Sequence, residues 1–143
     1  MSSMRDEYER GIQLYNAGDL EGHANLYTED AVLVNPNGTA QGRAAIREQW
    51  SRDKAGFPDC TVTIDVSVEQ GDTVAGEWTW VGTNTGPLVM PDGTEVPPTG
   101  KRVELKGMEL AQMRDGKIAV HHGYWDNMAV AGQLGLLPGE AGT

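Results

Sequence analysis

The second half of the chain alternates apolar and polar residues, which is the pattern of β-strands with one buried face. In "TVTIDVSVE", residues 61–69, the apolar positions share one face of such a strand, and they are Val62, Ile64, Val66 and Val68. Similar runs occupy residues 73–86, 102–113 and 117–125, while the proline-rich segment 87–101 has the composition of a long loop. We expect the runs to pair as an antiparallel sheet.

Helical spacing dominates the first half. Apolar residues three or four positions apart predict a helix over residues 4–16, and Gly18 is placed to end it. Asp19 is a typical N-cap for a second, short helix, and a third is predicted from about Arg43 to the break at "GFPD". Between them, "AVLVNPNG", residues 31–38, has the pattern of a strand that ends in a turn. Helices followed by an antiparallel sheet indicate the α+β class, with a cavity between the two layers.

Composition narrows the class of protein. The chain has 143 residues, enough for one domain over residues 1–143, and 21 Asp and Glu against 11 Lys and Arg give a net charge of −10. Such an acidic surface repels phosphate backbones and anionic lipids, so we expect no binding to nucleic acid or to membranes. The sequence shows no apolar bilayer-crossing stretch and no signal-peptide core. The single cysteine, Cys60, fits a reducing compartment, and we expect a cytoplasmic protein.

The stretch "HHGYWDN", residues 121–127, gathers several side chains that could carry chemistry. Neighbouring side chains of a strand point to opposite faces, so His121 and His122 cannot hold one metal ion. No other spacing of His, Cys or carboxylate residues indicates a metal site, and we expect neither metal nor cofactor. Asp126 stands where a strand meets a helix. We therefore expect it to cap that helix, with a catalytic role in the pocket as the alternative.

Five motifs follow one another along nearly the whole chain: "YNAGDLEGHANLYTEDAVLVNPNG", "GTNTGPL", "PPTGKRVEL", "RDGKI" and "YWDN…QLGL". Over about residues 4–138 this series resembles the SnoaL-like polyketide cyclase (ester cyclase) family of the nuclear-transport-factor-2-like superfamily. The resemblance implies a cone-shaped barrel, in which a curved antiparallel sheet wraps around N-terminal helices and encloses a pocket. It also implies an intramolecular aldol reaction without metal or cofactor, in which an aspartate removes a proton from a carbon flanked by carbonyls.

The family's functional positions transfer unevenly to this chain. Asn35 matches the pocket asparagine of the cyclases and Tyr15 matches their aromatic residue near the end of the first helix. Glu109 stands at the position of their histidine, and Gly107 at that of their glutamine. Their catalytic aspartate falls on Gly123. The chain therefore uses another group, catalyses another reaction, or only binds a ligand.

The register of the last two strands decides which side chains share a face. A two-residue hairpin loop would shift the pairing by one residue, but the family register favours a three-residue loop over residues 115–117. The inner face then carries Gly107, Glu109, Ala111, Met113, His121, Gly123 and Trp125. The outer face carries Met108, Leu110, Gln112, Ile118, Val120, His122 and Tyr124. Because the outer set is apolar, and members of this fold often dimerise there, we expect a homodimer through the convex face.

Glu109 and His121 are the only ionisable residues of that inner face, and they lie diagonally within reach of each other. We expect them to form an acid/base pair, with a structural contact as the alternative. Trp50, Trp78 and Trp80 either line a pocket for a flat ligand or belong to the core, and we expect Trp125 to face the pocket. His23, on a helix, is expected to be partly exposed.

Two functions remain open from the sequence. In the first, the protein binds a small hydrophobic molecule that bears a carbonyl and catalyses cofactor-free proton transfer, as a cyclase-like lyase or an isomerase. In the second, a protein of the same fold binds a small molecule without catalysis, as an accessory to a pathway enzyme.

Overall fold

A computed structural model describes residues 3–90 and 92–137 of the chain. The helices are α1 (Met4–Ala17), α2 (Leu20–Ala24), α3 (Arg43–Gly56) and α4 (Asn127–Leu134). The strands of the large sheet are β1 (Tyr27–Asn35), β2 (Gly38–Gln41), β3 (Thr61–Gln70), β4 (Thr73–Thr83), β7 (Arg102–Arg114) and β8 (Lys117–Tyr124). A small separate hairpin holds β5 (Leu88–Val89) and β6 (Glu95–Val96) within the predicted long loop.

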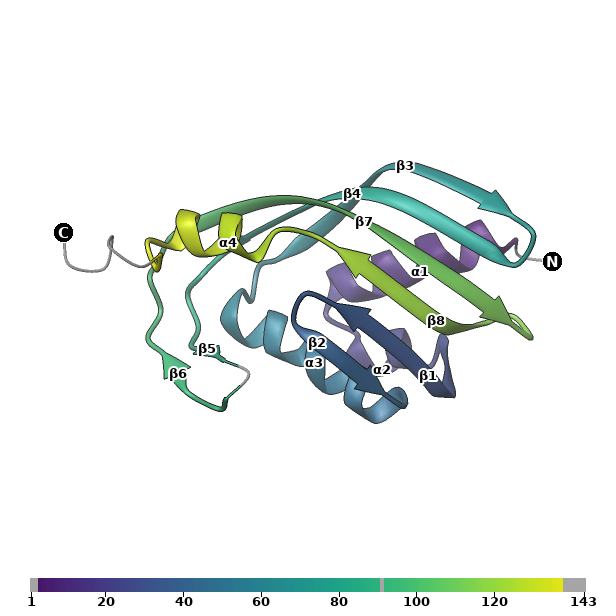
Figure 1. Ribbon diagram of the computed structural model, residues 1–143, viewed down its shortest axis with the longest axis horizontal. Helices are drawn as coiled ribbons and strands as arrows, with labels where there is room; N and C mark the ends of the chain where they lie inside the picture. Colours follow the sequence, from purple (N-terminus) through teal and green to yellow (C-terminus); the bar gives the residue numbers. More distant parts are fainter. Residues whose placement is uncertain (1–2, 91, 138–143) are drawn as a thin grey trace.

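The six strands form one curved sheet in the order β2-β1-β8-β7-β4-β3. Every pairing is antiparallel except that of β1 with β8. Figure 1 shows the sheet arching over α1, α2 and α3, with α1 packed against β3 and β4, and α3 against β1 and β2. The α+β cone fold expected from the sequence is confirmed. No helix within the described residues has the length and apolar character needed to cross a membrane.

Local sequence signals set the helix ends. Ser3 begins α1 with a capping box, in which its hydroxyl accepts from the amide of Asp6 and the Asp6 carboxylate accepts from the amide of Ser3. Gly18 ends α1 in the left-handed conformation at φ 78°, a region that favours glycine. Asp19 caps α2 as predicted, accepting from the amide of Gly22. These caps hold α1 so that its Tyr8 and Tyr15 side chains are buried under the sheet.

The β7–β8 hairpin reaches the predicted register by a different route. Its turn is a two-residue one, Asp115–Gly116, with φ of 52° and 79°, and Arg114 pairs with Lys117. The pairing then shifts between Gln112 and Met113, because β8 contains a bulge. Beyond the bulge, Ala111 pairs with His121 and Glu109 with Gly123, as expected. The bulge also turns Ile118 inward, where it is 5% exposed, so its predicted place on the outer face is wrong.

A second bulge corrects the prediction for β3. Ile64 pairs with Trp78 and Val66 with Glu77, so Asp65 is the extra residue. The apolar side chains before the bulge are partly buried, whereas Val66 and Val68 are each 57% exposed. Strict alternation would have kept all four on one face, and the extra residue moves the last two to the convex face.

The segment between β4 and β7 is fixed by one buried asparagine. The Asn84 amide donates to the carbonyl oxygens of Gly56 and Gly86, and its oxygen accepts from the amide and the hydroxyl of Thr99. Its side chain is 0% exposed, so these bonds satisfy a polar group that would otherwise be costly to bury. They tie the segment to the end of α3, and the β5–β6 hairpin thereby lies beside the open end of the cone.

Two apolar clusters make the core. One joins β1, α3, β7 and β8 through Tyr27, Leu33, Ile46, Ala111 and Ile118. The other joins α1, β4, β7 and α4 through Tyr15, Phe57, Trp78, Leu105 and Leu134. Trp50 packs against both clusters. The space that they leave between the sheet and the helices is the cavity described next.

Candidate functional site

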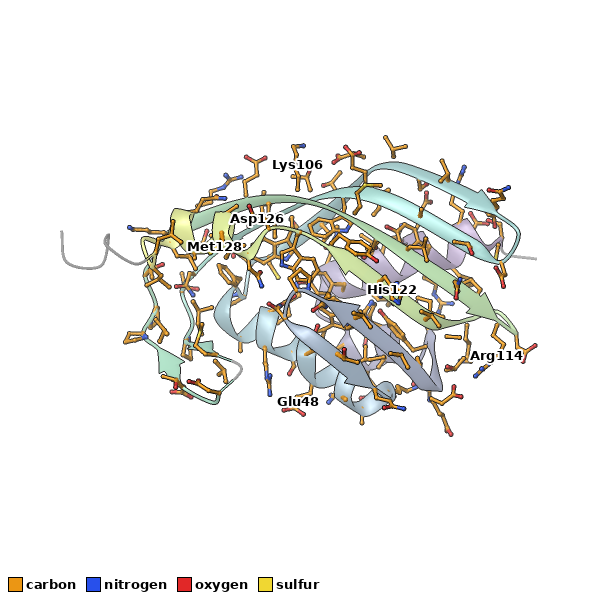
Figure 2. All side chains as sticks on the ribbon, viewed as in Figure 1. Glu48, Lys106, Arg114, His122, Asp126 and Met128 are labelled. Atoms are coloured by element: carbon orange, nitrogen blue, oxygen red, sulfur yellow. The ribbon has the colours of Figure 1, made fainter. Side chains whose placement is uncertain are left out.

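A cavity of about 810 Å³ lies between the concave face of the sheet and helices α1 and α3. Aromatic rings form much of its wall, among them those of Tyr15, Tyr27, Trp50, Trp78, Trp80 and Trp125. Figure 2 shows the contrast with the outside, where Lys106 and Arg114 project away from the ribbon. A mostly apolar, concave site of this size suits a small organic molecule.

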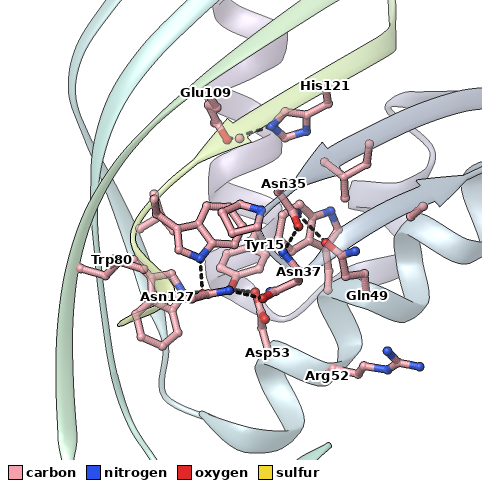
Figure 3. Close-up of a pocket in the computed structure, with 18 of the residues that line it drawn as sticks. Tyr15, Asn35, Asn37, Gln49, Arg52, Asp53, Trp80, Glu109, His121 and Asn127 are labelled. Carbon is pink, nitrogen blue, oxygen red and sulfur yellow. Dashed lines mark hydrogen bonds and ion pairs between the residues drawn. The ribbon is translucent and has the colours of Figure 1, made fainter. Parts of the chain in front are cut away.

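Glu109 on β7 and His121 on β8 meet at one end of this cavity (Figure 3). The register places them diagonally, and His121 Nε2 lies 2.9 Å from Glu109 Oε2. Their side chains are only 8% and 10% exposed. The other ring nitrogen, Nδ1, lies 2.8 Å from the hydroxyl of the buried Tyr27. Both nitrogens of the imidazole are therefore engaged, and its ring is held in one orientation.

The surroundings set the protonation of this group. Burial favours a raised pKa for Glu109, but the charge and hydrogen bond of His121, together with the neighbouring Tyr8 hydroxyl, hold the pKa below its ordinary value. Burial and the Glu109 charge raise the pKa of both Tyr8 and Tyr27. Glu109 is thus a carboxylate at neutral pH, and the tyrosines keep their protons. The group can stabilise positive charge and relay a proton through the imidazole.

His23 of α2 also faces the cavity, which sequence reasoning missed. It is 8% exposed, so the expectation of a partly exposed residue is wrong. Its ring packs edge-on against those of Tyr27 and Trp50, at centroid distances of 5.5 and 6.2 Å. Burial, and then the nearby His121, lower the pKa of His23 to about 4. It is a neutral part of the wall, brought inward by the tight turn between α1 and α2.

In this chain the positions matched to the family's aspartate and glutamine are Gly123 and Gly107, and tryptophan rings occupy the space beside them. A Cβ at Gly123 would lie 3.0 Å from the Trp125 ring, and a Cβ at Gly107 would lie 2.5 Å from the Trp78 ring. The two rings pack edge to face at 5.9 Å. The glycines therefore make room for indoles where the cyclase relatives carry polar side chains.

A chain of side-chain amides connects Asn35, beside Gly123, with the Trp125 indole. Asn35 is 8% exposed, donates to Gln49 Oε1 at 2.6 Å and accepts from the backbone of Asn37 at 2.9 Å. The Asn37 side chain in turn accepts from Asn127, which accepts from the Trp125 indole at 2.7 Å. Asn35 and Trp125 both line the cavity, and this chain of hydrogen bonds fixes their orientation.

Asp126 caps α4, as its position at the strand end predicts. Its Oδ1 accepts from the backbone amide of Met128 at 2.9 Å. The side chain is exposed and does not line the cavity. The catalytic alternative for Asp126 therefore has no support in the geometry, because the N-cap conformation directs its carboxylate to the helix end.

Tyr15 belongs to a polar cluster that the sequence did not reveal. Its hydroxyl donates to Asp53 Oδ2 at 3.0 Å, accepts from the Trp80 indole at 3.1 Å and lies 3.3 Å from the Cys60 sulfur. Burial raises the pKa of Asp53 to about 7, although Tyr15 and Lys54 act to lower it. One signal was present: Asp53 follows Trp50 by three positions, so the two residues share one face of α3.

Metal binding by side chains finds no site in the described part of the chain. Within residues 3–90 and 92–137, no group of three or more His, Cys, Asp or Glu residues is arranged to hold a metal ion. The polar groups of the cavity instead form separate hydrogen-bonded clusters around an aromatic wall.

This arrangement, a cone with an aromatic cavity and a few buried polar groups, defines a small-molecule-binding class of α+β domain. A model of the SnoaL-like polyketide cyclase family matches residues 5–134. The chain belongs to this family, as its motifs suggested.

Solved structures of similar proteins have the same fold. IdmH from Streptomyces antibioticus, described as a candidate polyketide cyclase, is 31% identical with a TM-score of 0.79, over 94% of this chain and 99% of that one. AclR from Streptomyces galilaeus, described as a candidate hydroxylase, is 23% identical with a TM-score of 0.81, over 94% and 82%. TsrD from Streptomyces laurentii is 25% identical with a TM-score of 0.79, over 93% and 95%. No curated protein sequence matches the chain.

Proposed function

We propose that the protein binds a small hydrophobic molecule bearing a carbonyl and catalyses cofactor-free acid/base chemistry on it, either an aldol-type cyclisation or an isomerisation. Glu109 and His121 are the proton-transfer pair of this proposal. Asn35, Tyr15, Trp50, Trp80 and Trp125 bind the substrate. The observation that carries it is the buried contact of 2.9 Å between Glu109 and His121 at the end of an apolar cavity.

Three features support this function. The family and the 31% identical IdmH, described as a candidate polyketide cyclase, support this class of reaction. The aromatic wall lowers the local polarity around Glu109 and His121, which strengthens the electrostatic interactions of this pair. The Tyr27 hydroxyl holds Nδ1 of the imidazole, so that Nε2 stays on Glu109 and can share the proton that Glu109 exchanges with a bound carbon or oxygen.

The alternative is a binding protein without catalysis. Two observations favour it: Gly123 replaces the base of the cyclases, and the Trp125 ring occupies the space beside it. In addition, the lowered pKa of Glu109, which burial opposes and His121 causes, makes this carboxylate a weak base.

Exchange of the α-protons of 2-tetralone in D₂O, followed by NMR, separates the two functions. We expect the wild type to accelerate exchange, and Glu109→Gln to lose at least about 100-fold of the acceleration. Quenching of tryptophan fluorescence measures binding of the same ketone. Binding with no accelerated exchange would establish the alternative, and failure to bind would contradict both.

We also propose that the protein is a cytoplasmic homodimer. The convex patch, formed by Val66, Val68, Met108, Leu110 and Tyr124, includes side chains up to 62% exposed, and apolar patches of this kind mark interfaces. The thiol of Cys60 is free and buried, which fits a reducing compartment. Sedimentation equilibrium should give a dimer for the wild type and a monomer for Met108→Lys. A wild-type monomer at all concentrations would contradict the dimer.

A further inference from the structure

The helix side of the cavity carries a carboxyl group that the proposed chemistry does not use. Asp53 on α3 lines the cavity, and its Oδ2 accepts a hydrogen bond from the Tyr15 hydroxyl at 3.0 Å. Figure 3 shows Glu109 and His121 at the top of the view and Asp53 at the bottom, with Tyr15 between. The two carboxyl groups thus belong to different parts of the same cavity.

Asp53 has unused hydrogen-bonding capacity. Within the described residues, no basic side chain lies within ion-pair distance of it, and its Oδ1 forms no hydrogen bond. The neighbouring Lys54 ammonium instead donates to the backbone oxygen of Cys60 at 2.7 Å and lies 4.6 Å from the centre of the Tyr15 ring. A carboxyl group that is partly buried and lacks a cationic partner is available to a ligand.

Tyr15 is held in place beside it. The Trp80 indole donates to its hydroxyl at 3.1 Å, while the Cys60 sulfur lies 3.3 Å away. The titratable groups around Asp53 are therefore Tyr15 from α1, Lys54 from α3 itself and Cys60 from the segment before β3. Trp80 and Cys60 hold the Tyr15 hydroxyl from outside α3. The hydroxyl therefore has a fixed position from which it orients the Asp53 carboxyl group.

Aromatic rings connect the two polar ends. The Trp50 ring lies 5.9 Å from the Tyr15 ring and 6.2 Å from the His121 ring. A flat aromatic molecule packed along this wall would present one end to Glu109 and His121 and the other to Asp53. Each end of the ligand then needs a polar atom. A carboxyl group that faced an apolar edge would lose its hydrogen bonds to water and gain none from the ligand.

We propose that Asp53 and Tyr15 form a second polar subsite of the cavity, which hydrogen-bonds a hydroxyl or carbonyl oxygen at the far end of a planar aromatic ligand. The subsite rests on the proposed function, because the near end of that ligand meets Glu109 and His121. It defines the ligand class as fused aromatic rings with an oxygen at each end. Asp53 accepts from a hydroxyl when it is ionised and donates to a carbonyl when it is protonated.

Two probes test the subsite: 2-naphthol, with one hydroxyl, and 2,6-dihydroxynaphthalene, with two. At pH 8, we expect the second hydroxyl to improve the dissociation constant of the wild type roughly tenfold, the effect of a hydrogen bond to a charged group. In Asp53→Asn the improvement should fall to about threefold or less. It should also decline towards pH 5.5 in the wild type but not in Asp53→Asn, which a purely structural role would not produce.

Asp115→Asn is the matched control, because Asp115 lies in the exposed β7–β8 turn, where asparagine tolerates the positive φ of 52°. Tyr15→Phe gives a second variant, for which we expect an intermediate loss. An equal improvement in wild type and Asp53→Asn, or none in the wild type, would overturn the subsite while leaving 2-tetralone binding and exchange intact. Failure of the wild type to bind either naphthol would count against the aromatic-ligand cavity, and the subsite with it.

Discussion

The cavity has a sheet wall, which carries Glu109 on β7, and a helix wall, which carries Asp53 on α3, and the pKa values of these two carboxyl groups are shifted in opposite directions. On the sheet wall, burial alone would raise the pKa of Glu109, but His121 and the Tyr8 hydroxyl lower it. On the helix wall, burial raises the pKa of Asp53 to about 7, since Tyr15 and Lys54 only partly oppose it. The partners of each carboxyl group, rather than its depth, decide its charge.

This difference separates two roles. Glu109 is a fixed negative charge that holds an imidazole, whereas Asp53 gains and loses its proton near neutral pH. The protonation of Asp53, unlike that of Glu109, therefore decides whether it accepts from a ligand hydroxyl or donates to a ligand carbonyl. Variants of the two walls test whether Glu109 and Asp53 differ in this way, beginning with the largest expected effect.

Removing His121 should destabilise the sheet wall, which holds the Glu109–His121 pair. In His121→Ala, the Glu109 carboxylate loses its partner while it stays buried, and we expect a loss of about 3 kcal/mol in the free energy of unfolding at pH 7. Urea denaturation measures it. The loss should shrink at pH 4, where Glu109 can take up a proton instead. A loss below about 1 kcal/mol would mean that the pair adds little to stability, as surface pairs do.

The next variants compare the packing of the two walls. In Gly107→Ala, the new Cβ would lie 2.5 Å from the Trp78 ring and 2.8 Å from the backbone oxygen of Tyr124, so we expect a loss of about 2 kcal/mol. Gly11→Ala on α1 is the matched control, since its Cβ would lie 3.3 Å from Leu26 and alanine favours helices. Urea denaturation of both variants measures the two losses in the free energy of unfolding. Equal losses would contradict a sheet wall that is packed more tightly than the helix wall.

The pH dependence of stability should distinguish Asp53 from Glu109. Between pH 4 and 7, native Asp53 keeps a proton that the unfolded chain, with a pKa near 3.8, has released. Its contribution to stability therefore falls as pH rises through this window and is constant above it. Asp53→Asn lacks this fall, so its stability relative to wild type should increase by about 2 kcal/mol from pH 5 to pH 8, somewhat less than the two pKa values give because Asp53 is partly exposed. Urea denaturation at both values tests this, and Asp115→Asn should show no such change.

The contribution of Glu109 to stability changes with pH in the opposite direction to that of Asp53. Its native pKa, which burial would raise and His121 lowers, lies below the ordinary glutamate value of 4.5. Its stabilising contribution is therefore complete above that value and is lost as pH falls through the native pKa. Glu109→Gln should differ from wild type most at neutral pH and least in acid, the reverse of the trend for Asp53→Asn.

The sheet wall could be predicted because the family register set the pairing of β7 with β8; the predicted three-residue loop was wrong, and the bulge in β8 compensates for the shorter turn. Once the β7–β8 register was chosen, Glu109 and His121 had to share a face. The bulges that moved Ile118 inward and Val66 outward are extra residues that leave no mark on a pattern of alternation. The helix wall needs tertiary information. Asp53 meets Tyr15 only because α1 and α3 pack on one sheet, and His23 is buried by the docking of a five-residue helix.

A third carboxyl group, Asp126, sharpens the contrast because it should matter to neither wall. In Asp126→Ala, the amide of Met128 loses its acceptor, and we expect a loss of about 1 kcal/mol from α4. Asp126→Asn should be nearly neutral, since asparagine caps helices equally well. Neither variant should change the affinity for 2-naphthol, because the exposed side chain does not line the cavity. If both weakened binding while only the alanine variant lost stability, Asp126 would belong to the ligand site as well as to the cap.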